Sequence, residues 1–234
     1  MFVLRGYTRS GTEMLRSALD QHPDIICHRP IFTDKNKDEL AKGDPQRLLL
    51  DKNLRQTDGF VMGAGPPRGD EVVRLAVSEM WGYVSSQSMA VVAIQRRDIL
   101  RMFVSDAIQR TGRPRTVKLS DKPNKTKQTL LIRPEQLLRA AAAAQQVADI
   151  TASQFPWAKV VYYEDMLANW NTKIDEILSY IGATRMYLGA MTRRQEVRKI
   201  RKIVQNYEEL KTELYGSRPE LFDIAEHTDG IFSY

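Results

Sequence analysis

The sequence has little of what would cross-link a small protein or hold a metal ion. Cys27 is the only cysteine among 234 residues, and there are three histidines. A single cysteine excludes an intrachain disulfide, and so few Cys and His side chains argue against a zinc site. No run approaches about 18 apolar residues, so no membrane-spanning helix is expected. The first residues lack a basic region and a long apolar region, so we expect no signal peptide and a cytoplasmic location.

A strong excess of charge is also missing. Lys and Arg total 35 and Asp and Glu total 29, which gives a net charge of +6. This modest excess favours an anionic ligand, whether phosphate, sulfate, nucleotide or nucleic acid, and does not choose among them. Hydrophobic residues make up 42% and charged residues 27% of the chain, as in ordinary globular proteins. The length fits one domain over residues 1–234.

Short apolar runs alternate with helical patterns along the chain. Strands are expected at 2–4, 25–27, 59–62, 89–94 and 159–163, and helices at 12–20, 39–50, 70–85, 98–110, 134–155, 169–181 and about 203–214. The run at 89–94 is wholly apolar, as in a parallel sheet covered on both faces. This alternation predicts an α/β fold with a mainly parallel sheet flanked by helices. Residues 113–130 are rich in Lys, Arg, Pro and Asn and predict a basic loop or hairpin insertion.

The loop after the first expected strand has the composition of an anion site. A loop there directs backbone N–H groups and the positive end of the next helix at a ligand. Gly6 and Gly11 have the spacing of the Walker A glycines, but Thr12 and Glu13 stand where that motif needs Lys and Ser or Thr. The cation, Arg9, comes before the second glycine. The alternative is an ordinary strand–helix turn with a solvated arginine.

The sequence Arg-Ser-Gly-Thr at 9–12, followed by leucines at 15 and 19 and His-Pro-Asp at 22–24, resembles a sulfotransferase motif. These enzymes use 3′-phosphoadenosine 5′-phosphosulfate (PAPS). The closest match is to the branch that contains the protein-tyrosine, carbohydrate and nodulation sulfotransferases. The resemblance implies a loop that wraps the 5′-phosphosulfate, formed by Arg9, Ser10, Gly11, Thr12 and Glu13.

A second family signature follows the apolar strand at 89–94. Arg97 and Ser105 are eight positions apart, which is the family spacing for the residues that bind the 3′-phosphate. An arginine at a strand end can bind a phosphate bidentately. Weaker similarities are Tyr-Tyr-Glu-Asp at 162–165, and Arg193 and Arg194 followed by Asn-Tyr-Glu-Glu-Leu at 206–210. The resemblance implies one P-loop-NTPase-like α/β domain in which Arg193 or Arg194 closes over the cofactor.

The resemblance also implies a reaction, in which a sulfuryl group passes from PAPS to an acceptor hydroxyl and PAP is released. No metal is expected, because arginines such as Arg9 replace Mg²⁺ in stabilising the transferring group. The protein-tyrosine branch carries a catalytic glutamate shortly after His-Pro-Asp, but residues 27–31 contain no carboxylate. His28 is therefore the expected general base, since its ordinary pKa lies near ~6.5. Glu13, which replaces a family threonine, is a second candidate.

Two other functions stay open. A non-catalytic module of the same fold that binds nucleotides or polyanions would account for Glu13 and for the missing glutamate. A P-loop kinase is the less favoured alternative, because Thr12 stands in place of the Walker lysine. For a sulfotransferase we expect a small-molecule or carbohydrate acceptor and neither a nucleic-acid nor a membrane partner. Trp81 and Trp157 could stack on adenine, but their positions are more typical of a core.

Overall fold

The computed structural model describes residues 1–28, 58–63, 71–111, 117–118, 129–193 and 198–231. Its contacts divide the chain into two compact units. The sheet unit comprises Met1–Gln95 and Val147–Ala190, and the helical unit comprises Arg96–Gln146 and Met191–Tyr234. The helix expected at 39–50 and nearly all of the basic segment at 113–128 lie outside the described residues.

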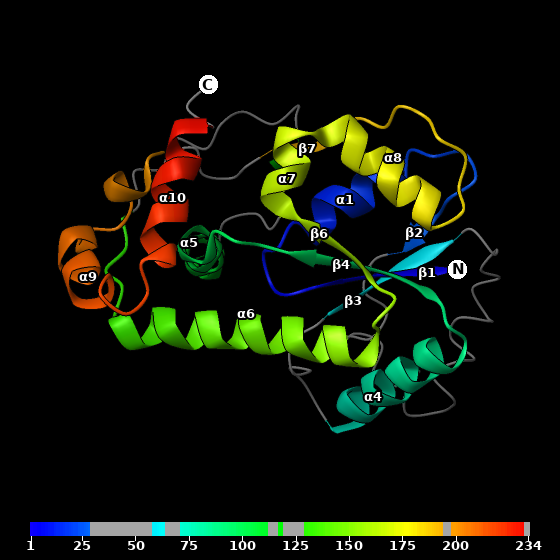
Figure 1. Ribbon diagram of the computed structural model, residues 1–234, viewed down its shortest axis with the longest axis horizontal. Helices are drawn as coiled ribbons and strands as arrows, with labels where there is room; N and C mark the ends of the chain where they lie inside the picture. The colour runs from blue at the N-terminus through cyan, green and yellow to red at the C-terminus, as the bar shows by residue number, and fades with distance from the viewer. Residues whose placement is uncertain (29–57, 64–70, 112–116, 119–128, 194–197, 232–234) are drawn as a thin grey trace. The chain divides into compact units, whose positions relative to one another are not determined.

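A parallel sheet of five strands is the centre of the sheet unit (Figure 1). Its strands are β1 (Phe2–Gly6), β2 (Cys27–His28), β3 (Gly59–Gly63), β4 (Ala90–Gln95) and β6 (Lys159–Tyr162). They lie in the order β2-β3-β1-β4-β6, and every neighbouring pair is parallel. The prediction of an α/β fold with a mainly parallel sheet is confirmed.

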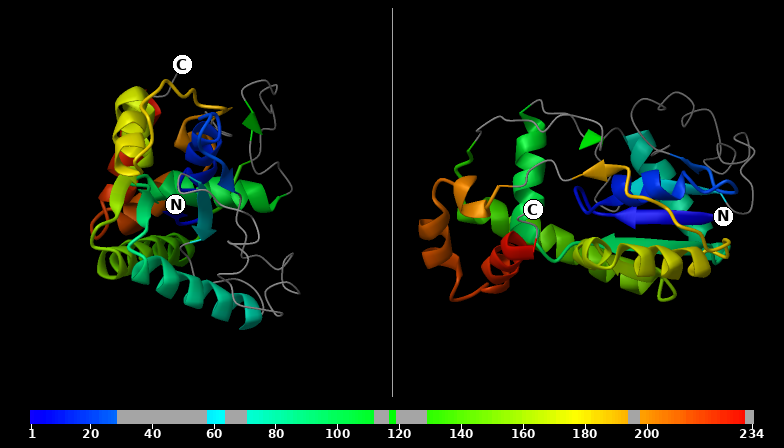
Figure 2. Two further views of the ribbon diagram at one scale, coloured as in Figure 1. Left: turned by 90° about the vertical axis from the view of Figure 1, so that its right-hand side faces the viewer. Right: turned by 90° about the horizontal axis from the view of Figure 1, so that it is seen from above.

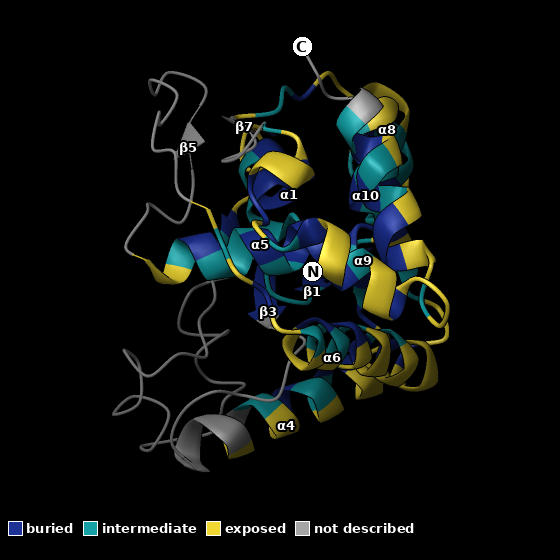
Figure 3. Cartoon of the chain, turned by 90° about the vertical axis from the view of Figure 1, so that its left-hand side faces the viewer, coloured by how far each residue is buried: buried dark blue, intermediate teal, exposed yellow. Residues whose placement is uncertain are grey.

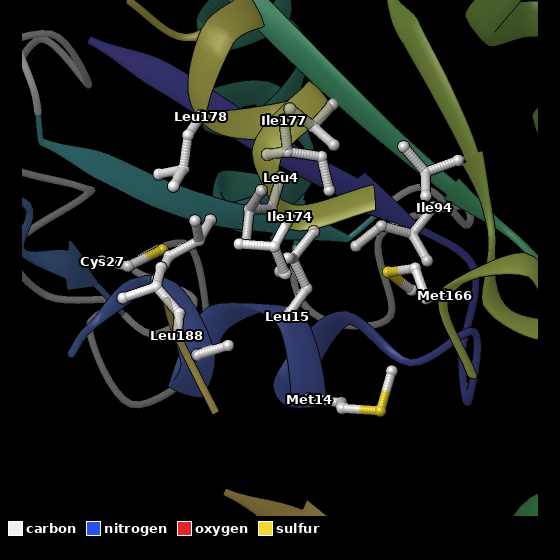
Figure 4. Close-up of a cluster of buried hydrophobic side chains, with 14 of the residues drawn as sticks. Leu4, Met14, Leu15, Cys27, Ile94, Met166, Ile174, Ile177, Leu178 and Leu188 are labelled. Atoms are coloured by element: carbon white, nitrogen blue, oxygen red, sulfur yellow. The ribbon is translucent and has the colours of Figure 1, made fainter. Parts of the chain in front are cut away.

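Helices cover both faces of this sheet (Figures 1 and 2). One face carries α1 (Thr12–Leu19), α7 (Tyr163–Ala168) and α8 (Trp170–Tyr180), and the other carries α4 (Glu71–Ser86). Because side chains alternate along a strand, Phe2 and Leu4 face α1 and α8, whereas Val3 faces the opposite layer. Figure 4 shows the first of these layers, in which Leu4 and Leu15 lie among the isoleucines and leucines of α8. Burial of each such side chain stabilises the fold by about 1.5–3 kcal/mol.

The helical unit contains α5 (Ile99–Arg110), the first part of α6 (Pro134–Gln154), α9 (Tyr207–Leu214) and α10 (Glu220–Ile231). A 3₁₀ helix, η2 (Ile200–Lys202), precedes α9. Asp98 caps α5, because its Oδ1 accepts a hydrogen bond of 2.9 Å from the backbone N–H of Arg101. Figure 3 shows α10 with buried residues on one side and exposed residues on the other. The buried side carries Leu221, Phe222 and Ala225.

Three elements differ from the sequence-based expectation. The helix α10 was not predicted, although Leu221, Phe222 and Ala225 have helical spacing. The last predicted helix begins at Tyr207 rather than near residue 203, because Val204 forms a bridge with Leu130 first. In the basic segment, β5 (Val117–Lys118) pairs antiparallel with β7 (Thr192–Arg193) and not with a neighbouring stretch. Among the described helices, none has the length and the apolar character needed to cross a membrane.

Candidate functional site

The loop from Tyr7 to Gly11 joins the central strand β1 to α1, and two of its residues have left-handed backbone. Arg9 has φ 61° and Gly11 has φ 101°, while Ser10 between them does not have positive φ. Alternation of this kind turns successive backbone N–H groups toward one point and makes an anion-binding concavity. A non-glycine residue in the left-handed region is uncommon and costs about 1 kcal/mol or more, and such strain is concentrated at functional sites. The carboxyl end of a parallel strand is also where α/β folds bind ligands.

Steric packing explains why glycine occupies the two ends of the loop. A Cβ at Gly6 would lie 2.6 Å from Oγ1 of Thr12, and it would overlap Oγ of Ser10. A Cβ at Gly11 would overlap the ring of Tyr163, whose Cε2 would lie 3.1 Å away. The hydroxyls of Ser10 and Thr12 therefore lie close to Gly6, the last residue of β1, and their oxygens are 3.2 Å apart. The loop is held tightly, as a binding site for a small anion requires.

The carboxylate of Glu13 is committed to a partner on its own helix. Its two oxygens accept hydrogen bonds of 2.9 Å from Nε and Nη2 of Arg16. Nη1 of Arg16 donates to the carbonyl oxygen of Cys27 at 3.1 Å and to Asp20 at 3.4 Å. These interactions, with the hydrogen bond to Glu13 the largest, raise the pKa of Arg16. The Glu13 charge is thus neutralised one turn along α1, which removes the repulsion that a carboxylate would otherwise exert on a bound anion.

The second predicted pair lies in the helical unit. Arg97 directly precedes the cap residue Asp98 and is exposed, and Ser105 is half-buried two turns along α5. Arg101 lies between them in the sequence, one turn before Ser105 on the same side of α5. Asp98 and Arg101 are both buried. The first turn of α5, which begins just after Arg97 and Asp98, is therefore fixed by a buried charge pair.

The predicted base does not lie at the loop. His28 pairs with Phe60, which pairs with Val3, so His28 is level with the middle of β1. Gly6 is three residues further on, a rise of about 10 Å along the strand direction. Alternation also places His28 on the face of Phe60 and Val3, which is opposite to α1. Its Nε2 is buried, with no hydrogen-bond partner in the described structure. The assignment of His28 as base stays a prediction.

The remaining predicted cofactor contacts cannot be placed side chain by side chain. Arg193 lies in β7, where only its backbone is described, and Arg194 is outside the described residues. Both arginines keep their role as a prediction.

The C-terminal similarity has a structural explanation. Oδ1 of Asn206 accepts from the N–H of Ile132 at 3.0 Å, and Nδ2 of Asn206 donates to the Ile132 carbonyl at 2.8 Å. The Asn206 amide thus continues the backbone pairing of Leu130 with Val204. The hydroxyl of the next residue, Tyr207, donates to Glu226 at 2.7 Å. This motif joins segments of the helical unit and need not touch a ligand.

The tyrosine motif after β6 also carries out a packing role. Tyr163 begins α7, and its buried ring is the one that lies against Gly11. Glu164 and Asp165 lie in the first turn of α7, where acidic side chains interact favourably with the helix dipole.

Trp81 packs on Phe155 at 5.3 Å between ring centroids, which supports the core assignment of that tryptophan. No set of three or more His, Cys, Asp or Glu side chains in the described segments is placed to hold a metal ion.

Sequence reasoning missed the most unusual side chain of the sheet unit. Arg5 on β1 is only 3% exposed, and its guanidinium lies 4.2 Å from the ring centroid of Trp81. Among the described residues, Nη1 of Arg5 donates to Oε1 of Gln154 at 3.2 Å, and Nε is buried without a hydrogen-bond partner. Burial lowers the pKa of Arg5 to about 10. An arginine in a short strand is usually expected to face solvent, so the neighbouring sequence does not predict this burial.

Comparison with known proteins supports the fold and nothing finer. No protein-family model matches the sequence, and the search of curated proteins gives no match. Among solved structures, a sulfotransferase from Alicyclobacillus acidocaldarius is similar with a TM-score of 0.53 at 13% identity, over 96% of this chain and 94% of that one. Mouse sulfotransferase SULT7A1 complexed with PAP is similar with a TM-score of 0.50 at 13% identity, over 100% of this chain and 89% of that one.

These similarities extend over nearly the whole chain. They do not distinguish the branches that the sequence motif suggested. The expectation of one domain over residues 1–234, with an insertion at 113–130, stays a prediction. The chain has a sulfotransferase fold.

Proposed function

We propose that the protein is a PAPS-dependent sulfotransferase that transfers a sulfuryl group to an acceptor hydroxyl and releases PAP. The observation that carries the proposal is the loop between β1 and α1, with its two left-handed residues and its cation. The donors there suit a phosphosulfate: the Arg9 guanidinium, the hydroxyls of Ser10 and Thr12, and the N–H groups at the start of α1. The mouse structure with the same fold is described as a complex with PAP.

The reaction needs positioning and charge stabilisation more than covalent chemistry from the protein. PAPS supplies the sulfuryl group on a phosphate leaving group. By analogy with phosphoryl transfer, donors fixed around the bridging oxygen stabilise the charge that develops there. Arg9 and the positive end of α1 serve this purpose, and the Thr12 hydroxyl donates to the 5′-phosphate. Arg97 and Ser105 hold the 3′-phosphate and set the register of the nucleotide, aided by Arg193 or Arg194.

The acceptor hydroxyl has to lose its proton as the new bond forms. His28 is the proposed base, because histidine is the side chain that most often accepts a proton in general base catalysis. Glu13 is less suited than its position in the sequence suggested, because both of its oxygens bind Arg16. Replacing His28 with Gln should lower turnover about 10²–10⁴-fold with little change in the affinity for PAP.

A non-catalytic nucleotide-binding module is the second candidate, and one observation favours it. Within the described residues, neither the imidazole of His28 nor an unengaged Glu13 carboxylate is brought to the loop. The two candidates predict the same cofactor binding and differ in turnover. Incubation with labelled PAPS and a panel of sugars, phenols and small alcohols separates them, because only the enzyme transfers label to an acceptor.

The binding half of the proposal is tested by calorimetric titration of PAP in buffer with a metal chelator. Arg9→Ala should weaken PAP about 10- to 150-fold, the loss expected for a charge-assisted hydrogen bond. Alanine retains Cβ and therefore the backbone preference at φ 61°, which glycine would change. Arg139→Ala, at an exposed position of α6, is the matched control and should bind PAP as the wild type does. Equal affinities for PAP in all three proteins would remove the loop from the site.

The proposed 3′-phosphate residues have their own test. PAP and AMP differ only by the 3′-phosphate. Arg97→Ala should therefore weaken PAP by about 10-fold or more and leave AMP nearly unchanged. A similar loss for both nucleotides would show that Arg97 does not bind the 3′-phosphate.

A further inference from the structure

A buried ion pair in the helical unit joins three segments beside the predicted 3′-phosphate residues. Arg101 on α5 is 5% exposed and forms ion pairs with Asp229 on α10 and with Asp98, whose Oδ2 lies 3.5 Å from Nε of Arg101. Nη2 of Arg101 also donates to the carbonyl oxygen of Arg198 at 3.2 Å. One side chain thus connects the start of α5, the chain before η2, and the C-terminal helix.

Asp229 completes the connection from the other side. Its carboxylate accepts the backbone N–H of Ile200, at 3.0 Å from Oδ2 and 3.3 Å from Oδ1. Ile200 is fully buried, and Asp229 is the acidic residue that α10 contributes to this cluster near its C-terminal end. The chain that leads from β7 into η2 is therefore fixed at residue 198 by Arg101 and at residue 200 by Asp229.

The position of the cluster relates it to the proposed cofactor contacts. Asp98 caps α5 with Oδ1 and pairs with Arg101 through Oδ2, so the backbone immediately after Arg97 is held by both interactions. Ser105 lies one turn further along the same side of α5. Neither Arg101 nor Asp229 is available to a ligand, because each is engaged by the other and largely buried.

We propose that Arg101 and Asp229 are positioning residues for the 3′-phosphate: they hold the first turn of α5 so that Arg97 and Ser105 converge on it. The inference rests on the proposed function. A buried ion pair is weak evidence that its charges stabilise the fold, since apolar residues of the same volume often stabilise a protein equally well. What the charged pair adds is a fixed direction, because the carboxylate of Asp229 binds both the Arg101 guanidinium and the backbone N–H of Ile200.

The test compares PAP and AMP binding in Asp229→Asn, which keeps the shape of the side chain and removes its charge. PAP affinity should fall roughly 2- to 30-fold, the range for residues that act through others, and AMP affinity should change less than about twofold. Asp223→Asn on the same helix is the matched control, because its carboxylate accepts a hydrogen bond from exposed Tyr215 and does not reach the cluster. Asp229→Glu restores the charge and should recover part of the PAP affinity.

Each result decides the matter. An equal loss of PAP and AMP affinity, or a lower melting temperature with both affinities intact, overturns the inference, because a purely structural role predicts those outcomes. If wild-type protein prefers PAP to AMP and Asp229→Asn keeps that preference, the inference fails and the proposed function stands. If the wild type binds neither nucleotide, both fail together. Should Asp229→Asn not fold, the same comparison is made with Arg101→Lys, which retains the charge and alters only the geometry.

Discussion

Two buried arginines, Arg101 in the helical unit and Arg5 in the sheet unit, have opposite surroundings. Arg101 in the helical unit is 5% exposed and has two carboxylates, those of Asp98 and Asp229. Arg5 in the sheet unit is 3% exposed, and no carboxylate of the described residues pairs with it. Its guanidinium lies 4.2 Å from the ring centroid of Trp81 and 5.2 Å from that of Phe155.

The difference separates charges that maintain structure from charges that the fold only tolerates. A buried cation that pairs with two carboxylates fixes the direction of several segments, and removing one partner leaves an uncompensated charge. A buried cation that has aromatic faces and one neutral amide recovers only part of its lost hydration. The pKa of about 10 for Arg5, lowered by burial, expresses that incomplete compensation.

The largest effect is expected when the paired arginine is removed. Arg101→Met should lower the free energy of unfolding by about 3–5 kcal/mol, because two buried carboxylates lose their cation. Urea unfolding followed by circular dichroism measures the change. The double variant Arg101→Met with Asp229→Leu should recover part of the loss, since it removes one of the uncompensated charges.

The control for this variant lies on the same helix. Arg110 bonds Asp106 at 2.6 Å, but its side chain is 63% exposed. Arg110→Met should therefore change the free energy of unfolding by less than about 1 kcal/mol. If Arg101→Met lowers the free energy of unfolding no more than Arg110→Met does, the Arg101 ion pairs do not hold the helical unit together.

Arg5→Met should have the opposite sign. Lowering the pKa of Arg5 from 12.5 to about 10 corresponds to a burial penalty of about 3 kcal/mol in the charged state. The lost cation–π contact and the lost hydrogen bond to Gln154 offset about 2 kcal/mol of that relief. A net gain of about 1 kcal/mol in unfolding free energy is expected. A loss of more than about 1 kcal/mol would show that Arg5 has a compensating anion, and the contrast between the two arginines would disappear.

The sequence predicted what depends on local pattern. The apolar strand predicted at 89–94, the helix that follows it and the glycine-bounded loop all depend on neighbouring residues, and the structure contains each of them, with the strand at Ala90–Gln95. The pairing of Glu13 with Arg16 is also local, since it has the i,i+3 spacing, and it could have been inferred. The signal for α10 was present in its apolar spacing and was not used.

What could not be predicted depends on segments that are distant in sequence. His28 was the expected base because it lies shortly after His-Pro-Asp, where the family resemblance implies a glutamate, but its level relative to Gly6 is set by pairing through β3. The burial of Arg5 depends on Trp81 and on α6, and no property of the sequence around Arg5 signals it. Strand register and the packing of distant segments are determined by the whole sheet. A sequence motif can therefore identify the residues of a site without predicting their positions in space.

A smaller effect tests a third arginine, which belongs to the sheet unit and is paired. Arg16 is 8% exposed, and Glu13 supplies it with two hydrogen bonds. Glu13→Gln should lower the free energy of unfolding by about 1 kcal/mol, because Arg16 keeps its bonds to Cys27 and Asp20. PAP affinity by calorimetry should stay within about threefold of the wild type. Unchanged stability together with abolished sulfuryl transfer would instead identify Glu13 as the catalytic base.

The smallest effect concerns the partly exposed charges of the helical unit, where solvent weakens each interaction. Glu226 accepts hydrogen bonds from Lys211 at 2.8 Å, from Tyr207 at 2.7 Å and from Arg201 at 3.0 Å. These donors, Lys211 first, lower the pKa of Glu226 to about 2. Because the folded pKa lies below the unfolded one, this stabilisation is present above about pH 4.5 and is lost as the pH falls toward 2.

Wild-type protein should therefore lose more stability between pH 5 and pH 2, values set by that window, than Glu226→Gln does. Urea unfolding at a series of pH values gives both curves, and their separation should stay below about 1 kcal/mol because the carboxylate is one-third exposed. The Arg101 cluster, by contrast, is protected from solvent, so its contribution should be insensitive to salt while that of Glu226 declines. If stability falls equally with pH in wild type and Glu226→Gln, and depends on salt in the same way, the hydrogen bonds to Glu226 do not stabilise the folded protein.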